Sequence, residues 1–72
     1  MALNNTVLKE LRKEKKLTQT ELASKLDIGQ SAYAKWENGR TEPTLENIVK
    51  LSKILDTTTD ELLGIDKSLS SN

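Results

Sequence analysis

The 72-residue sequence contains no cysteine, no histidine and no phenylalanine, and it has a single proline. Without cysteine and histidine, neither disulfide bonds nor the usual zinc sites can stabilise the chain. The same absences remove the commonest general acid–base group and the thiol nucleophile, so we expect no catalysis, no metal ion and no other cofactor. A chain this short must then be held together by efficient packing alone.

The sequence also lacks a long apolar run. No segment approaches the roughly 20 residues that a membrane-spanning helix needs, and the start MALNNTVLKE lacks the basic and apolar parts of a secretion signal. We therefore expect a cytoplasmic protein with no membrane partner. With only 72 residues the chain has no length left for a ligand-sensing domain, so no small-molecule ligand is expected either.

Net charge is missing as well, because eleven basic residues balance eleven acidic ones. The balance is uneven along the chain: residues 1–16 carry a net charge of +3, and residues 42–72 carry −3. A basic end suits an anionic partner such as DNA, but a solvated helix face with interspersed lysines explains it equally well. Charge alone leaves both interpretations open.

What the chain does contain is apolar residues at helical spacing. Leu, Ile and Val make up 18 of the 72 residues, which is enough for one small folded domain. Leu3, Val7, Leu8 and Leu11 lie on one face of a helix that we expect to end near Lys16.

Two short helices are predicted in the middle of the chain. Thr18 and Glu21 have the spacing of a capping box, so a helix starts at Thr18 and runs to about Asp27. The next helix covers residues 30–38, and Gly39 suits the left-handed residue that ends many helices. A connection of about three residues forces these helices into a steep crossing, which is the architecture of a helix-turn-helix.

Two more helices follow. Thr44 is expected to cap the fourth, whose apolar positions predict a wide buried stripe made of Leu45, Ile48, Val49, Leu51, Ile54 and Leu55. The fifth helix is predicted to begin with a capping box of Thr58 and Glu61 and to end at Gly64. The whole pattern indicates an all-α domain of five helices.

With these elements in this order, the sequence resembles the Cro/CI (XRE) family of helix-turn-helix domains. The resemblance covers residues 5–64 and rests on the collinear segments LRKEKKLTQTELASKL, IGQSAYAKWENGRTEPTLENIVKLSKIL and TTTDELLG. It implies a compact five-helix lambda-repressor-like DNA-binding domain over residues 1–66, followed by a short polar tail of residues 67–72. The chain is most similar to small temperate-phage regulators of the lysogeny switch, either Cro-like repressors or modulators of repression.

The resemblance implies a set of DNA-binding residues. In that family the second helix of the motif lies in the major groove and reads base edges. The base-reading positions, with one residue of the same face, fall on Gln30, Ser31, Lys35 and Ala34. The positions that contact the DNA backbone fall on Gln19, Asn38, Arg40 and Thr41. Read without the family, the same residues could simply begin and end helices or carry solvated charges.

The resemblance also implies structural roles for four residues. Arg12 and Glu37 match a pair that bridges the first helix to the end of the third and fixes the reading helix. Tyr33 and Trp36 are the only aromatic residues and could stack on bases, but the family places core residues there. Partial exposure of either ring is the alternative.

Two positions depart from the family pattern. Asp27 stands where the family usually has glycine at the end of the second helix, and aspartate adopts the left-handed conformation at some cost. Gly29 stands where serine or threonine usually caps the third helix. Glycine caps tolerably but supplies no hydroxyl for a neighbouring phosphate, which puts one backbone contact in doubt.

The sequence is compatible with two functions. The first is a sequence-specific transcriptional regulator that binds a double-stranded operator as a homodimer, with half-sites about one helical turn apart. The second is an anti-repressor or modulator that binds a companion phage repressor and alters its DNA binding. Its contact surface would be the face of the second and third helices, where Ser31, Ala32 and Ala34 lie beside Trp36.

Overall fold

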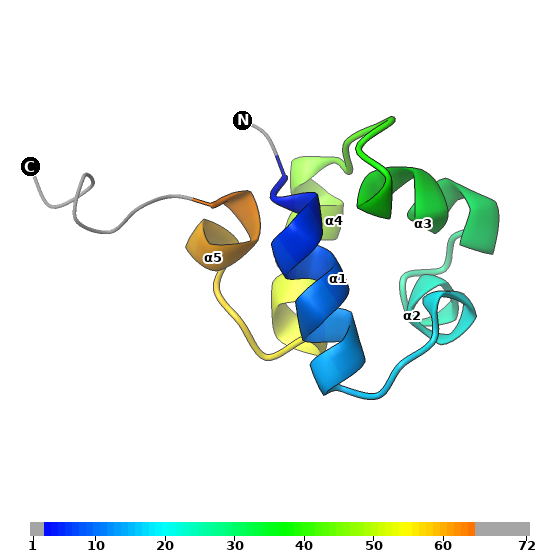
Figure 1. The fold of residues 1–72 in the computed structure, drawn as a ribbon, viewed down its shortest axis with the longest axis horizontal. Helices are drawn as coiled ribbons and strands as arrows, with labels where there is room; N and C mark the ends of the chain where they lie inside the picture. The colour runs from blue at the N-terminus through cyan, green and yellow to red at the C-terminus, as the bar shows by residue number, and fades with distance from the viewer. Residues whose placement is uncertain (1–2, 65–72) are drawn as a thin grey trace, which may run out of the picture.

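Five α-helices make up most of residues 3–64, the part of the chain that the computed structural model describes (Figure 1). They are α1 (Asn5–Glu14), α2 (Gln19–Lys25), α3 (Gln30–Glu37), α4 (Leu45–Ile54) and α5 (Thr59–Leu63). No strand occurs among these residues, so the all-helical prediction is confirmed. The predicted tail of residues 67–72 lies outside the described residues, and so do residues 1, 2, 65 and 66 of the predicted domain.

Side-chain caps define the start of four helices. At α1, α2, α4 and α5 an Asn or Thr oxygen accepts a hydrogen bond from the backbone N–H three residues later, and the capping residues are Asn4, Thr18, Thr44 and Thr58. The predicted capping box of Thr18 and Glu21 is complete. At α5 only one of the two bonds of the predicted capping box is present, the one from the Glu61 N–H to the Thr58 hydroxyl. The second is wrong, because the Glu61 carboxylate accepts from the Thr57 hydroxyl instead of from the backbone N–H of Thr58.

Four helices end in the same left-handed turn. The residue that follows the C-cap has a positive φ of 57° at Lys16, 60° at Asp27, 73° at Gly39 and 55° at Asp56. At each turn the next N–H donates to a carbonyl in the last turn of the helix, as the N–H of Ile28 does to Ala23 at 3.0 Å. The left-handed conformation expected for Asp27 is confirmed, and these turns stop α1, α2 and α3 one or two residues before their predicted ends.

The core is formed by one or two residues from each helix and by Leu26 and Leu55, which directly follow α2 and α4. The largest fully buried side chains are those of Tyr33, Leu8, Leu22, Leu51, Leu55 and Leu62. Core packing of both aromatic residues is confirmed, because Trp36 is only 7% exposed and meets Tyr33 edge to face, with ring centroids 5.7 Å apart. The back of α3 is thereby held against the rest of the molecule.

The buried stripe of α4 is narrower than predicted. Ile48 and Leu51 are buried, but Leu45 is 59% exposed and Val49 is 38% exposed. Since successive helical residues are rotated by roughly 100°, Leu45 and Val49 lie beside the inward-facing line through Ile48 rather than on it. The prediction that these two residues belong to the core is wrong.

Within residues 3–64, none of the helices combines the length and the apolar character that crossing a bilayer requires.

Candidate nucleic-acid interface

Helix α3 has one buried side and one exposed side. Its buried residues are Tyr33, Trp36 and Glu37. The predicted base-reading residues lie on the opposite side, where Gln30, Ser31 and Lys35 are exposed and Ala34 is partly exposed. Residues 26–29 join α2 to α3, and the two helices pack against each other (Figure 1). The arrangement presents the first turns of α3 as an accessible ridge.

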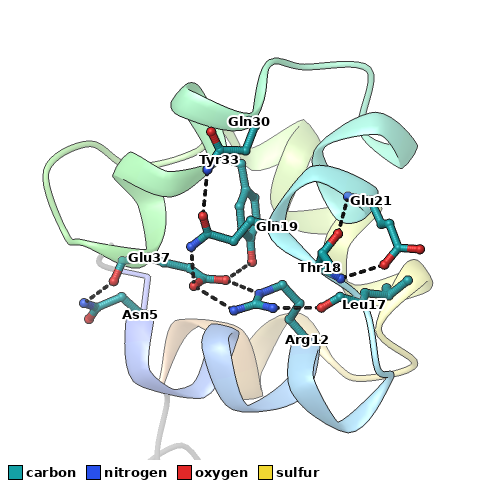
Figure 2. A network of polar contacts seen from close by, with 9 residues as sticks. All are labelled: Asn5, Arg12, Leu17, Thr18, Gln19, Glu21, Gln30, Tyr33 and Glu37. Atoms are coloured by element: carbon teal, nitrogen blue, oxygen red, sulfur yellow. Dashed lines mark hydrogen bonds and ion pairs between the residues drawn. The ribbon is translucent and has the colours of Figure 1, made fainter.

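Gln30 is tied to the interior through Gln19 (Figure 2). The Gln30 amide donates to Oε1 of Gln19 at 2.8 Å, and the Gln19 amide donates to Oε1 of Glu37 at 3.0 Å. This bond uses one of the two amide hydrogens of Gln30, which leaves a donor and a carbonyl acceptor for a ligand. A paired donor and acceptor is what the major-groove edge of adenine requires.

The predicted pair Arg12 and Glu37 is present as a buried, two-point ion pair. Arg12 Nε lies 2.6 Å from Glu37 Oε2, and Arg12 Nη2 lies 3.3 Å from Oε1. A third Arg12 nitrogen donates to the carbonyl oxygen of Leu17 at 2.7 Å, and the Tyr33 hydroxyl donates to Glu37 Oε2 at 2.5 Å. Within the described residues no buried side-chain nitrogen or oxygen lacks a partner. The network joins α1, the loop after it, α2 and α3 (Figure 2).

The network has a defined charge state. Burial alone would raise the pKa of the Glu37 carboxyl, but hydrogen bonds from Arg12, Tyr33 and Gln19 outweigh burial and hold this pKa below its usual range. The hydrogen bond to Glu37 raises the pKa of Arg12. Burial, and then the bond to Glu37, raises the pKa of Tyr33. At neutral pH the centre therefore consists of one anion, one cation and neutral donors.

The loop after α3 places the remaining predicted contacts at the surface. Asn38, Arg40 and Thr41 are exposed. The N–H groups of Arg40 and Thr41 both point back to the carbonyl of Lys35, at 2.9 and 3.4 Å, so the loop is a tight turn that follows the end of α3. Gly39 supplies the left-handed residue that this turn needs.

Gly29 caps α3 through its backbone only. It makes no side-chain capping bond, and a Cβ atom built on it would meet nothing within 4 Å. The residue that replaces the family's usual serine or threonine therefore has open space in front of it. The hydroxyl that the resemblance would place there is absent.

Sequence reasoning missed two members of the network. Asn5 donates from Nδ2 to the carbonyl oxygen of Glu37 at 3.1 Å, and Leu17 contributes only its backbone carbonyl. Neither role leaves a local signature, because each depends on a contact with a residue that the fold brings close. Among residues 3–64 no group of acidic side chains has the arrangement of a metal site.

Comparison with known proteins agrees with this architecture. A family model described as "Helix-turn-helix" matches residues 8–62. The HTH-type transcriptional activator BcrR of Enterococcus faecalis is 42% identical over 60 residues, which cover 83% of this chain and 29% of that protein. The cryptic phage CTXphi transcriptional repressor RstR of Vibrio cholerae is 40% identical over 53 residues, which cover 74% of this chain and 47% of that protein. The chain thus spans less than half the length of these two relatives.

Solved structures show where the same fold occurs. The P22 c2 repressor in complex with a synthetic operator superposes with a TM-score of 0.81 at 33% identity, over 92% of this chain and 100% of that one. This match confirms the lambda-repressor-like arrangement of the five helices. Hydroxypropylphosphonic acid epoxidase from S. wedmorenis also matches, with a TM-score of 0.75 at 32% identity, over 82% of this chain and 31% of that one. Because this fold also forms part of a larger epoxidase, the fold alone does not determine function, and the exposed side chains decide what the domain binds.

Proposed function

The chain belongs to the Cro/CI (XRE) family of helix-turn-helix transcriptional regulators, and we propose on this basis that it binds a specific DNA operator with α3 in the major groove. The observation that carries the proposal is the division of α3 into two sides. Its aromatic side is locked into the core, and its other side presents Gln30, Ser31 and Lys35. A helix held this way can enter a groove without rearrangement.

Each exposed residue has a role in this proposal. Gln30 pairs with an adenine edge and Lys35 with guanine acceptors, while Ser31 bonds either type of base. Ala34 lets the helix approach closely. The DNA backbone is contacted by Asn38, Arg40, Thr41 and Gln19. One amide hydrogen of Gln19 bonds Glu37 and its carbonyl oxygen accepts from Gln30, so Gln19 also orients Gln30. Its second amide hydrogen and the free N–H groups at the start of α2 are the donors for a phosphate.

The likeness to RstR and to the P22 c2 repressor supports a regulator of a phage-type genetic switch, such as the lysogeny switch. Such a regulator works where the host DNA is, in the bacterial cytoplasm. No chemical step is part of this function, because every role assigned to a residue is binding or positioning.

We further propose that two copies bind one operator and meet through α4. Leu45 and Val49 form an exposed apolar pair one turn apart, and beside them Lys50 lies 3.7 Å from Glu46. In a two-fold, antiparallel contact the acidic residue of each copy faces the basic residue of the other, so the surface is complementary to itself. Two apolar side chains bury little area, which predicts a weak dimer in solution that DNA completes.

A second candidate function is a modulator that binds a companion repressor. It is favoured by the zero net charge of the chain and by the missing cap hydroxyl at Gly29. The flat surface suggested for this contact is smaller than expected, because Trp36 lies in the core and does not extend it. Ser31 and Ala32 remain exposed on α3.

The experiment that tests the proposed function is selection from random-sequence DNA followed by gel retention of the selected duplex. Affinity should fall by about 100-fold or more between roughly 50 and 200 mM salt, because counterions compete for the phosphates. Lys35→Ala should cost about 1–3 kcal/mol on this duplex and relax the preference at one base pair, while Lys53→Ala removes the same charge from α4 and should preserve that preference. If no duplex is enriched, or if retention appears only after a companion repressor is added, direct operator binding is wrong.

A further inference from the structure

The first described residues of the chain bind both ends of the loop that follows α3. The Asn5 side chain donates from Nδ2 to the carbonyl oxygen of Glu37, the last residue of α3, at 3.1 Å. The backbone N–H of Leu3 donates to Oε1 of Glu42 at 2.7 Å. Residues 3–5 thus form a hydrogen bond at each end of residues 38–42, although the two segments are more than 30 positions apart in the sequence.

Asn5 also lies directly over the turn at Gly39. A Cβ atom built on Gly39 would be 3.5 Å from Nδ2 of Asn5, an ordinary van der Waals distance. The Asn5 amide therefore both bonds the end of α3 and covers the left-handed residue where the chain changes direction. Arg40 and Thr41, two of the proposed backbone contacts, follow immediately.

We propose that Asn5 is a positioning residue for DNA-backbone binding, acting through the loop of residues 38–42. The inference rests on the proposed function, because it assigns Asn5 to the loop that grips the phosphates. The physical reason is geometric. Phosphate contacts fix the register of a protein on DNA, so a loop that can swing loses them even when its own side chains are intact. The amide donor of Asn5 ties that loop to α1.

Asn4 offers a matched control in the adjacent position. Its side chain caps α1 by accepting from the N–H of Val7, and its backbone N–H donates to the carbonyl of Leu62. Asn4→Ala therefore weakens α1 without removing a side-chain bond to the loop. Asn5→Ala removes the bond to Glu37 and leaves the cap of α1 in place.

The test compares the wild type, Asn5→Ala and Asn4→Ala, all as the full chain, on a selected duplex and on a scrambled duplex over a range of salt concentrations. Asn5→Ala should lose about five- to tenfold in affinity on both duplexes, because backbone contacts carry no sequence information. Its plot of log affinity against log salt should become shallower by about 0.9, the loss of one phosphate contact. Asn4→Ala should lower the melting temperature and leave both affinities and the slope unchanged.

Hydrogen exchange gives a second readout that needs no DNA. The N–H of Arg40 is bonded to Lys35, and its exchange should quicken in Asn5→Ala relative to core amides but not in Asn4→Ala. Unchanged exchange in Asn5→Ala overturns the inference, and so does unchanged affinity or an equal loss in Asn4→Ala. If the wild type binds neither duplex, the proposed function fails. If the wild type binds and Asn5→Ala binds equally well, only the role of Asn5 is refuted.

Discussion

At Glu37, one carboxylate accepts hydrogen bonds from Arg12 of α1, Gln19 of α2 and Tyr33 of α3. The free-energy cost of removing Arg12 and Glu37 from water is roughly offset by the attraction between their charges, so the ion pair adds little net stability. Its effect is to fix position, because three helices are bound to one pair of oxygens. Replacing only one of the two residues is strongly destabilising, because it leaves the other charge buried without a partner.

A double-mutant cycle at Arg12 and Glu37 tests this view. Glu37→Leu alone should lower the free energy of unfolding by about 3–5 kcal/mol, because the Arg12 guanidinium is left buried and unpaired. That loss is comparable to the whole stability of a domain of this size, so the single variant should be largely unfolded. The double variant Arg12→Met, Glu37→Leu should recover most of the loss in urea unfolding followed by Trp36 fluorescence. Losses that simply add would contradict this assignment.

The same residue makes stability depend on pH. The pKa of Glu37 is lower in the folded chain than its unfolded value of about 4.3. Stability from this difference is fully present above the unfolded pKa and is lost as the pH falls through the folded one. Urea unfolding should therefore show stability decreasing from about pH 5 downward, with a shallower decrease in the double variant. Some decrease should persist there, because the backbone N–H of Thr18 also lowers the pKa of Glu21. Identical acid profiles would exclude Glu37 as a source of the effect.

At the scale of helices, the ends of the elements were predicted unequally well. Starts were found because Thr at a cap followed by Glu leaves a local signal, as at Thr18 and Glu21. The end of α1 is predicted two residues too late, because Lys16 adopts a left-handed turn that sequence patterns associate with glycine. Gly39 was predicted for the same turn, since there the residue type and the conformation agree.

Lys16→Gly tests the strain in these turns. The left-handed conformation destabilises a lysine by about 1–2 kcal/mol, and glycine removes this strain. Glycine also makes the unfolded chain more flexible, which offsets about 0.5–1 kcal/mol of the gain. The variant should therefore be more stable by about 0.5–1 kcal/mol in urea unfolding. Asp27→Gly should gain less, because aspartate can bond its own backbone in this conformation. Destabilisation of both variants would mean that the native side chains make contacts that outweigh the backbone strain.

Across the whole molecule, the exposed face of α3 follows from sequence and family resemblance, but the contacts that hold it do not. The resemblance places both Gln19 and Gln30 at the DNA, yet the hydrogen bond between them and the bond from Gln19 to Glu37 depend on how α2 crosses α3. The exposure of Leu45 and Val49 was also missed, because apolar periodicity alone does not show how much of a helix its neighbours cover. These features belong to tertiary packing.

Charge reversal on α4 tests the proposed pairing of two copies. Glu46→Lys places like charges opposite each other in a two-fold contact, and it should weaken binding to a duplex with two half-sites by about tenfold while sparing a single half-site. Adding Lys50→Glu restores opposite charges and should restore binding. Gel retention on the two duplexes measures both effects. Equal binding by all three proteins would place the dimer contact elsewhere.

We propose that the exposed side of α3 and the loop after it form the DNA-binding surface. The most direct test of this proposal is an NMR titration of the ¹⁵N-labelled chain with the selected duplex, recording which backbone amides shift. The largest shifts are expected at Gln30, Ser31 and Lys35 and in residues 38–41, and the buried face of α4 should change little. Shifts that gather on α5 and the outer face of α1, with α3 unaffected, would contradict the proposal.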